Sequence, residues 1–213
     1  MKKKQLWLSL LMLLSFAIWT ILLQYVDVKV IGPNDSSVGF ATINELFHRL
    51  TGVHMLLYHI SDWAGLVPIA FCMGFSILGL IQWIARRRIE KVDHSILILG
   101  GFYLVVITLY LLFESCVINY RPVLINGYLE ASYPSSKTLL VLSVIPTSIL
   151  QLRERINRPL LRQCITVVIS LFTFSMLILR LISGVHWLSD IIGGVLLSIG
   201  LVAGYRFLTS LKE

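Results

Sequence analysis

The feature that most limits how this chain can fold is a series of long apolar stretches separated by short polar segments. A helix needs about 20 mostly apolar residues to cross the hydrocarbon layer of a membrane. Only 14% of the 213 residues are charged, whereas soluble domains carry about 25%. The sequence therefore predicts an all-α integral membrane protein. We expect one domain over residues 1–213, a bundle of six spans at about residues 6–26, 63–84, 94–113, 136–152, 161–181 and 187–207.

The first span follows a basic start, MKKK, as the core of a signal peptide would. Its apolar run of about 20 residues exceeds the roughly 7–15 of a signal-peptide core, and no A-x-A cleavage pattern follows. We therefore expect a retained span. The three cysteines lie in or beside apolar runs without a CxxC pattern, which favours small core residues over a disulfide or a zinc site.

The basic residues indicate the orientation of the spans, because cytoplasmic loops are rich in Lys and Arg. Six spans place both termini and the loops after spans 2 and 4 on one side, and these regions hold 13 of the 18 basic residues. We expect that side to be the cytoplasm, in a bacterial cytoplasmic (inner) membrane. The basic residues left on the outer side are Lys29, Arg49, Arg121, Lys137 and Arg180.

The outer segment between spans 1 and 2 is too polar to cross a membrane, and its second half has apolar residues at helical spacing. We expect a helical segment along the outer interface. His48, His54 and His59 lie there without the spacing of a metal site. Neither a metal nor a cofactor is expected. Since the net charge of +7 comes from loop residues, nucleic-acid binding is not expected either, and no required protein partner is evident.

Three polar clusters lie at the outer ends of the spans, at residues 114–122, 133–138 and 180–190. In the second, Ser135 and Ser136 precede an apolar helix, whose free N–H groups and positive dipole end suit a phosphate. In the third, His186 and Asp190 lie four residues apart, so the carboxylate can fix the imidazole tautomer. Taken alone, the second cluster is better explained as a capped helix and the third as an interfacial histidine beside an acidic residue at a helix start.

Arg180 ends a long apolar run, where an arginine either reaches for the interface or serves a site. Together with Arg121 and Lys137 it makes three cations in the outer loops. Cations, a helix start and a His–Asp pair at one end of the bundle suit a phosphate site with a nucleophile.

At these residues the chain resembles the type 2 phosphatidic acid phosphatase family, which is related to the vanadium haloperoxidases. The family pattern is KxxxxxxRP, PSGH and SRxxxxxHxxxD. This chain reads ExxxxxxRP from Glu114, PSSK from Pro134 and LRxxxxxHxxxD from Leu179. The motifs cover roughly the C-terminal half of the chain, and the six-span layout is similar to that of the family's membrane enzymes.

The resemblance implies a lipid phosphatase that works at the outer face through a phosphohistidine. His186 would attack phosphorus and Asp190 would orient it. Glu114 replaces the family's lysine, and Lys137 replaces the histidine that protonates the leaving group. We expect Glu114 to modulate the site by pairing with Lys137. Lys137 would then contact the phosphate or donate the proton to the leaving group. The phosphoryl oxygens would be held by Arg121, Arg180, Ser135, Ser136 and Lys137.

Because lysine is a poor acid near neutral pH, a substrate with a good leaving group fits this chain best. A polyprenyl diphosphate, such as the undecaprenyl carrier lipid, is therefore favoured over phosphatidic acid. Two alternatives stay open: an impaired member that only binds anionic lipid headgroups, and a small transporter. Binding alone does not need HxxxD, and transporters hold substrates near the midplane on broken helices, so both rank lower.

Overall fold

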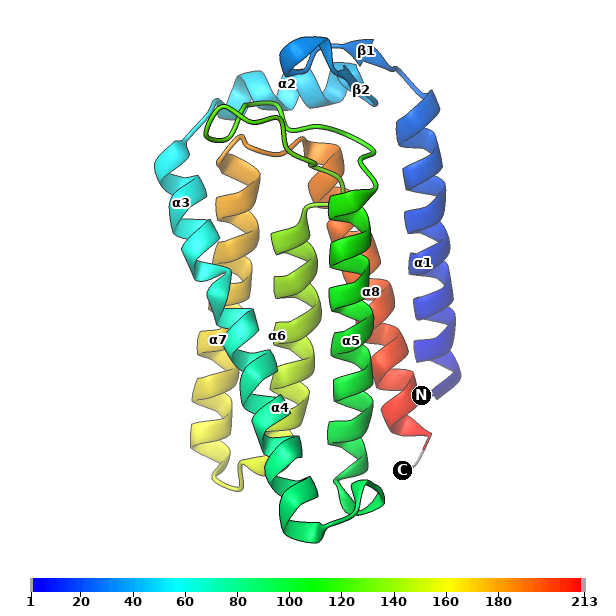
Figure 1. Cartoon of the computed structure of the whole chain (residues 1–213), viewed down its shortest axis with the longest axis vertical. Coiled ribbons are helices and arrows are strands. Elements are labelled where there is room, and N and C mark those ends of the chain that lie inside the picture. Colours follow the sequence, from blue (N-terminus) through cyan, green and yellow to red (C-terminus); the bar gives the residue numbers. More distant parts are fainter. Residues whose placement is uncertain (1, 212–213) are drawn as a thin grey trace.

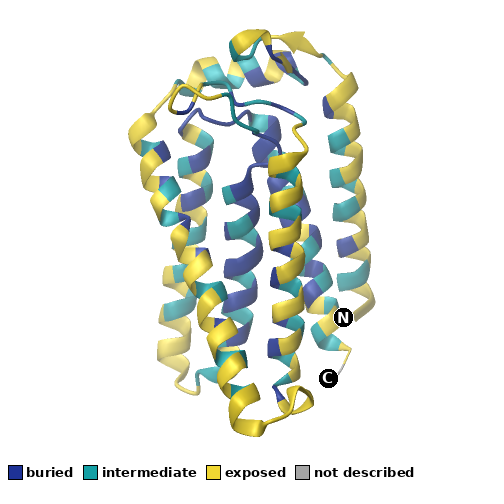
Figure 2. Cartoon of the chain, viewed as in Figure 1, coloured by how far each residue is buried: buried dark blue, intermediate teal, exposed yellow. Residues whose placement is uncertain are grey.

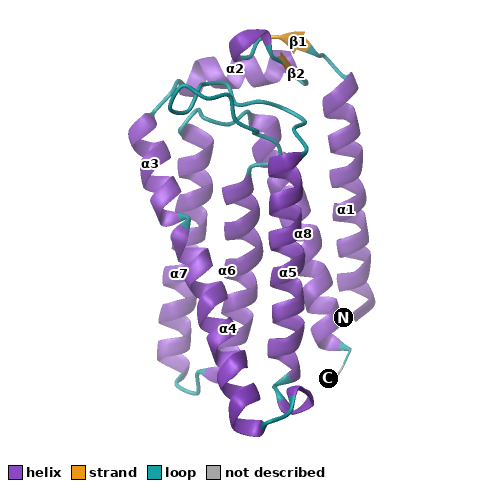
Figure 3. Cartoon of the chain, in the orientation of Figure 1, coloured by secondary structure: helices purple, strands orange, loops and turns teal. Residues whose placement is uncertain are grey.

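The structure, a computed structural model, describes residues 2–211 as a bundle of long helices under a small cap (Figure 1). Nearly all of it is helical (Figure 3), which confirms the all-α prediction. The helices are α1 (Lys2–Tyr25), α2 (Ala41–Thr51), α3 (Met55–Ala64), α4 (Leu66–Arg86), α5 (His94–Ser115), α6 (Ser136–Arg155), α7 (Pro159–Ile182) and α8 (Leu188–Ser210). The short elements are the 3-10 turns η1 (Pro33–Asp35) and η2 (Ile89–Lys91) and the antiparallel strands β1 (Lys29–Val30) and β2 (Ser37–Val38).

Five helical runs within residues 2–211 are long and apolar enough to cross a membrane: α1, α3 with α4, α5, α7 and α8. Many of their large apolar side chains point outward, for example Trp7, Leu104 and Val168. In water such a surface would be unfavourable, whereas hydrocarbon accepts it. The apolar outer surface therefore indicates an integral membrane protein.

The remaining long helix, α6, occupies the centre of the bundle and packs against α4, α5, α7 and α8 (Figure 2). Since protein surrounds it, some of its polar side chains form hydrogen bonds with neighbouring helices. The Tyr103 hydroxyl lies 3.0 Å from Ser148 Oγ, and the Gln151 amide donates to the Tyr205 hydroxyl at 2.7 Å. For this reason α6 is less apolar than the other five runs and is not among the candidate spans.

The predicted span 2, at about residues 63–84, agrees with α4 to within three residues, but the helical run extends further toward the N-terminus. The outer segment divides into α2, which lies across the end of the bundle, and α3, which leads into α4 with only Gly65 between them (Figure 1). The helical run that includes span 2 thus begins at Met55. The sequence predicted this stretch along the outer interface, but Ser61 is fully buried and α3 packs against α7.

Both ends of the described chain lie at the same end of the bundle as the α4–α5 and α6–α7 connections (Figure 1). The predicted basic loops are therefore gathered at one end. The opposite end holds α2, the β1–β2 ribbon and two loops, residues 116–135 and 183–187. All three polar motif clusters lie at or beside this second end, which we name the cap end.

Two glycines let the cap-end segments approach closely. Gly184 has φ +69°, and a Cβ there would lie 1.8 Å from the Gly52 carbonyl oxygen. The backbone N–H of His54 donates to the Ser183 carbonyl at 2.9 Å beside this contact. Gly193 faces the Tyr133 ring, and a Cβ there would lie 2.5 Å from a ring carbon. The α2–α3 link and the loop before α6 are thereby pressed against the start of α8.

Candidate active site

His186 lies in the short loop between α7 and α8 and is 3% exposed. Its Nε2 lies 2.6 Å from Nη2 of Arg180, and its Nδ1 lies 3.0 Å from Ser132 Oγ. A guanidinium can only donate, so Nε2 accepts and the ring proton is on Nδ1. Burial, together with the Arg180 and Arg121 guanidinium groups, holds the His186 pKa well below its usual value. The imidazole is therefore neutral near pH 7, with its Nε2 lone pair directed at the arginine.

Asp190 is fully buried in the first turn of α8. Its Oδ2 accepts hydrogen bonds from the Trp187 backbone N–H at 2.9 Å and from the Ser132 hydroxyl at 2.5 Å. The first of these bonds satisfies a free N–H at the helix start. His186 Nδ1 is 3.9 Å from Asp190 Oδ2, beyond hydrogen-bond reach. The structure therefore brings the predicted His–Asp pair together, but the direct hydrogen bond that we expected is replaced by Ser132.

Two buried arginines face the same region. Arg180, 1% exposed, also donates from Nη1 to Ser61 Oγ at 3.3 Å. Arg121, 7% exposed, lies 3.2 Å from the Glu130 carboxylate through Nε, without hydrogen-bond alignment. The Tyr58 ring packs against both guanidinium groups, with its centroid 5.5 Å from Arg180 Cζ and 5.8 Å from Arg121 Cζ.

The guanidinium groups keep unused donors. Within the described residues, Arg121 Nε and Nη1 and Arg180 Nε are buried without a hydrogen-bond partner. A buried polar group left unpaired is unfavourable, and unpaired cationic donors suit an anion with several oxygens. The region between the two arginines and His186 therefore has the chemistry of a phosphate site.

Lys137 lies in the first turn of α6 and pairs with Asp62 of α3, with 3.2 Å between Nζ and Oδ1. The predicted pair between Lys137 and Glu114 is wrong, since no ion pair within residues 2–211 joins them. Glu114 sits at the exposed end of α5 and lines a small hollow with Ser132 and Tyr133. Asp62 reaches Lys137 because α3 packs against the bundle instead of lying on the interface.

The two serines at the α6 start differ in their surroundings. Ser135 is fully buried, accepts the Thr138 hydroxyl at 2.9 Å and donates its backbone N–H to the Asp190 carbonyl at 3.1 Å. Ser136 is 9% exposed in the first helical turn. Their predicted contacts with phosphate stay a prediction. The backbone tie from Ser135 to Asp190 fixes the α6 start beside the His186 loop.

Several residues of the site carried no recognisable sequence signal. They lie on α3 or in the loop before α6, and they meet the motif residues only through the fold. Among the described residues, no group of three His, Cys, Asp or Glu side chains could hold a metal ion. The residues missed by the sequence analysis are Tyr58, Ser61, Asp62, Glu130 and Ser132.

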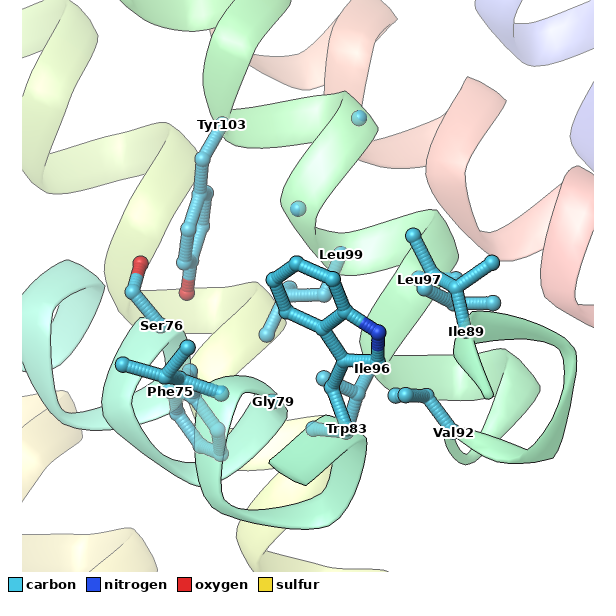
Figure 4. Close-up of a pocket in the computed structure, with 13 residues that line it drawn as sticks. Phe75, Ser76, Gly79, Trp83, Ile89, Val92, Ile96, Leu97, Leu99 and Tyr103 are labelled. Atoms are coloured by element: carbon cyan, nitrogen blue, oxygen red, sulfur yellow. The ribbon is translucent and has the colours of Figure 1, made fainter. Parts of the chain in front are cut away.

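A cavity of about 360 Å³ lies far from His186, toward the basic loops. Apolar and aromatic side chains from α4, η2 and α5 line it, among them Trp83, Leu99 and Tyr103 (Figure 4). Its lining holds no charged side chain and no histidine, and the hydroxyls that it offers are those of Ser76 and Tyr103. We therefore place the candidate active site at the cap end, around His186.

Fold and site together define a membrane-embedded helical protein with a buried histidine–arginine site. Residues 113–210, which hold all three motifs, match the family model of the PAP2 superfamily, which confirms the resemblance. The fold is similar to that in the crystal structure of a transmembrane PAP2-type phosphatidylglycerolphosphate phosphatase from Bacillus subtilis, with a TM-score of 0.61 and 17% identity over 97% of this chain and 98% of that one. No curated protein matched.

Proposed function

We propose that this protein is a membrane lipid phosphate or diphosphate phosphatase that works through a phosphohistidine at His186. The observation that carries the proposal is the neutral, buried imidazole whose Nε2 faces Arg180, beside guanidinium donors that have no hydrogen-bond partner among residues 2–211. The match of residues 113–210 to the PAP2 superfamily supports a phosphatase. A site for headgroup binding alone would not need a histidine with Nε2 unprotonated and its proton fixed on Nδ1.

In the proposed reaction, Nε2 of His186 attacks phosphorus and the bond from phosphorus to the leaving oxygen breaks, with its electron pair on that oxygen. Arg121 and Arg180 hold the phosphoryl oxygens, since guanidinium forks match their geometry. The N-terminus of α6, with Ser135, Ser136 and Lys137, adds positive potential. Water then attacks the phosphohistidine, inorganic phosphate leaves and the imidazole is restored.

The substrate that we favour is a polyprenyl diphosphate, such as the undecaprenyl carrier lipid. Lysine is a poor proton donor near neutral pH, and Lys137 is held in an ion pair with Asp62. A leaving phosphomonoester needs less protonation than an alcohol. The Bacillus subtilis protein of similar fold is described as a phosphatidylglycerolphosphate phosphatase, so a lipid phosphomonoester is the alternative substrate.

We further propose that all six long units, α6 included, cross a bacterial cytoplasmic membrane. The basic loops gathered at one end of the bundle would face the cytoplasm and the cap end would face outward. Lipid phosphates lie at the depth of the interface, where His186 would meet them. Outer residues of α2 such as Leu46 and Leu50 are exposed and apolar, which suits contact with the membrane surface.

The test is phosphate release by the purified protein in detergent, from polyprenyl diphosphate, phosphatidylglycerophosphate and phosphatidate, each compared with His186→Ala. We expect release that depends on His186 and is fastest with the diphosphate. An acid-labile phosphate label on the wild-type protein, lost in His186→Ala, would identify the phosphohistidine. Lipid binding without release from any of the three would support the alternative of an impaired, headgroup-binding member.

A further inference from the structure

The Ser132 hydroxyl lies between the two motif residues that family members use together. Its Oγ is 3.0 Å from His186 Nδ1 and 2.5 Å from Asp190 Oδ2, whereas Nδ1 and Oδ2 are 3.9 Å apart. All three side chains are 3% exposed or less. The carboxylate therefore reaches the imidazole through the serine.

The donor and acceptor at each step of this chain are fixed. Arg180 donates to Nε2 of His186, so the ring proton sits on Nδ1. That proton is shared between Ser132 Oγ and the Ser132 carbonyl oxygen, which lies 3.2 Å from Nδ1. The serine then donates its own proton to Asp190, which also accepts the Trp187 backbone N–H.

We infer that Ser132 is a positioning residue whose hydroxyl transmits the negative charge of Asp190 to His186. The inference rests on the proposed function, because it concerns the same nucleophile. Asp190 polarises the hydroxyl, and the more negative oxygen stabilises positive charge on the ring. No proton transfer is required, since each group keeps its own proton throughout.

This transmitted charge matters when the imidazole becomes a cation. As Nε2 bonds to phosphorus, the ring gains a positive charge while its proton stays on Nδ1. The charged groups that face the ring are Arg180, Arg121 and Asp190. The two arginines oppose the new positive charge, whereas Asp190 favours it and acts through Ser132. Hydrogen-bonded neighbours also polarise one another, which strengthens the chain.

The backbone holds Ser132 in place independently of its side chain. Its N–H donates to the Asn119 carbonyl at 2.9 Å. The next segment is tied to α8 by the bond from the Ser135 N–H to the Asp190 carbonyl. Removing only the hydroxyl should therefore leave the loop where it is, which makes Ser132→Ala a clean perturbation.

The experiment is a double-mutant cycle with Ser132→Ala, Asp190→Asn and the double variant. Ser132→Thr keeps the hydroxyl, and Ser143→Ala removes another buried serine hydroxyl, one inside α6 that has no hydrogen-bond partner among the described residues. Two quantities are measured. One is kcat and KM for phosphate release. The other is the Kd of orthovanadate, which takes a fifth ligand from a nucleophile and needs no turnover.

We expect Ser132→Ala to lower kcat about 10- to 100-fold, the range seen when partners behind metal-bound histidines are removed, with KM nearly unchanged. Asp190→Asn should have a similar effect, and the double variant should be no worse than either. Ser132→Thr should recover most of the rate, and Ser143→Ala should match the wild type. Losses that multiply in the double variant, or a Ser132→Ala variant as fast as the wild type, would overturn the inference.

The two measurements also separate this inference from the proposed function. Weakened vanadate binding that is non-additive across the cycle, without hydrolysis of any lipid, would support the serine's role and contradict the phosphatase proposal. Hydrolysis that needs His186 but shows multiplying losses would support the phosphatase and refute the role of Ser132.

Discussion

Replacing Arg180 with lysine tests whether the guanidinium fork holds the phosphoryl group. The side chain is almost fully buried at the end of α7 and uses two nitrogens, one toward His186 and one toward Ser61. Lysine keeps the positive charge but presents a single ammonium group. It cannot hold two oxygens in the geometry of the fork, so Arg180→Lys should impair turnover although the charge is retained.

The expected loss of activity in Arg180→Lys follows from the hydrogen bonds that the substitution removes or weakens. A hydrogen bond that involves a charged group contributes about 1.5–3 kcal/mol. Losing one such bond and weakening a second removes about 3–4 kcal/mol of transition-state stabilisation. At 1.36 kcal/mol per tenfold, kcat/KM should fall roughly 10²- to 10³-fold.

The assay is phosphate release under single-turnover conditions, with monodispersity on size exclusion as a check of folding. Arg206→Lys is the matched control, because Arg206 is exposed near the C-terminal end of α8, whereas His186 precedes the N-terminal end of that helix. It should behave as the wild type does. If the two lysine variants stay within threefold of each other, the role given to Arg180 is wrong.

Three further predictions follow from the site and the cap. Because the folded-state pKa of His186 is lowered, the unfolded chain takes up a proton below about pH 6.5 that the folded protein does not. The free energy of unfolding should therefore fall as pH drops below that value. Thermal unfolding between pH 7.5 and 5 should show a weaker pH dependence for His186→Gln than for the wild type. An equal pH dependence in both proteins would refute the neutral, buried state given to His186. Lys137→His introduces the family's acid and should raise the rate of phosphatidate hydrolysis relative to diphosphate hydrolysis by about 10²-fold or more. An unchanged ratio of the two rates would show that protonation of the leaving group does not limit hydrolysis. Gly184→Ala should lower both thermal stability and activity, because its Cβ would strike the Gly52 carbonyl, whereas Gly101→Ala, with no described atom near its Cβ, should be neutral or slightly stabilising.

The apolar stretches predicted most of the helices because hydropathy reports what faces lipid. The bounds of α1, α5, α7 and α8 agree with the predicted spans to within a few residues. The α3 helix was expected on the outer interface, whereas it packs against the bundle and turns Ser61 toward Arg180 and Asp62 toward Lys137. The sequence alone does not show whether a polar residue on a helix faces water or a buried partner.

The motif spacing brought Arg180, His186 and Asp190 into one site, because residues six and four apart stay close whatever the rest of the chain does. Ser132 could not be predicted, since its contact with His186 spans 54 residues and depends on how the loop before α6 folds. For the same reason, the sequence could not show whether Asp62 or Glu114 pairs with Lys137. Both acids lie near span ends, and only the packing of α3 decides between them.

The enclosed position of α6 also has a consequence for how the protein is made. Ser143, Thr147 and Gln151 are all buried among other helices, and its last turn carries Arg153 and Arg155. Such a segment partitions poorly into lipid by itself, because insertion scales penalise polar and charged residues. During synthesis α6 should therefore wait beside the insertion machinery until α7 and α8 emerge, and integrate together with them.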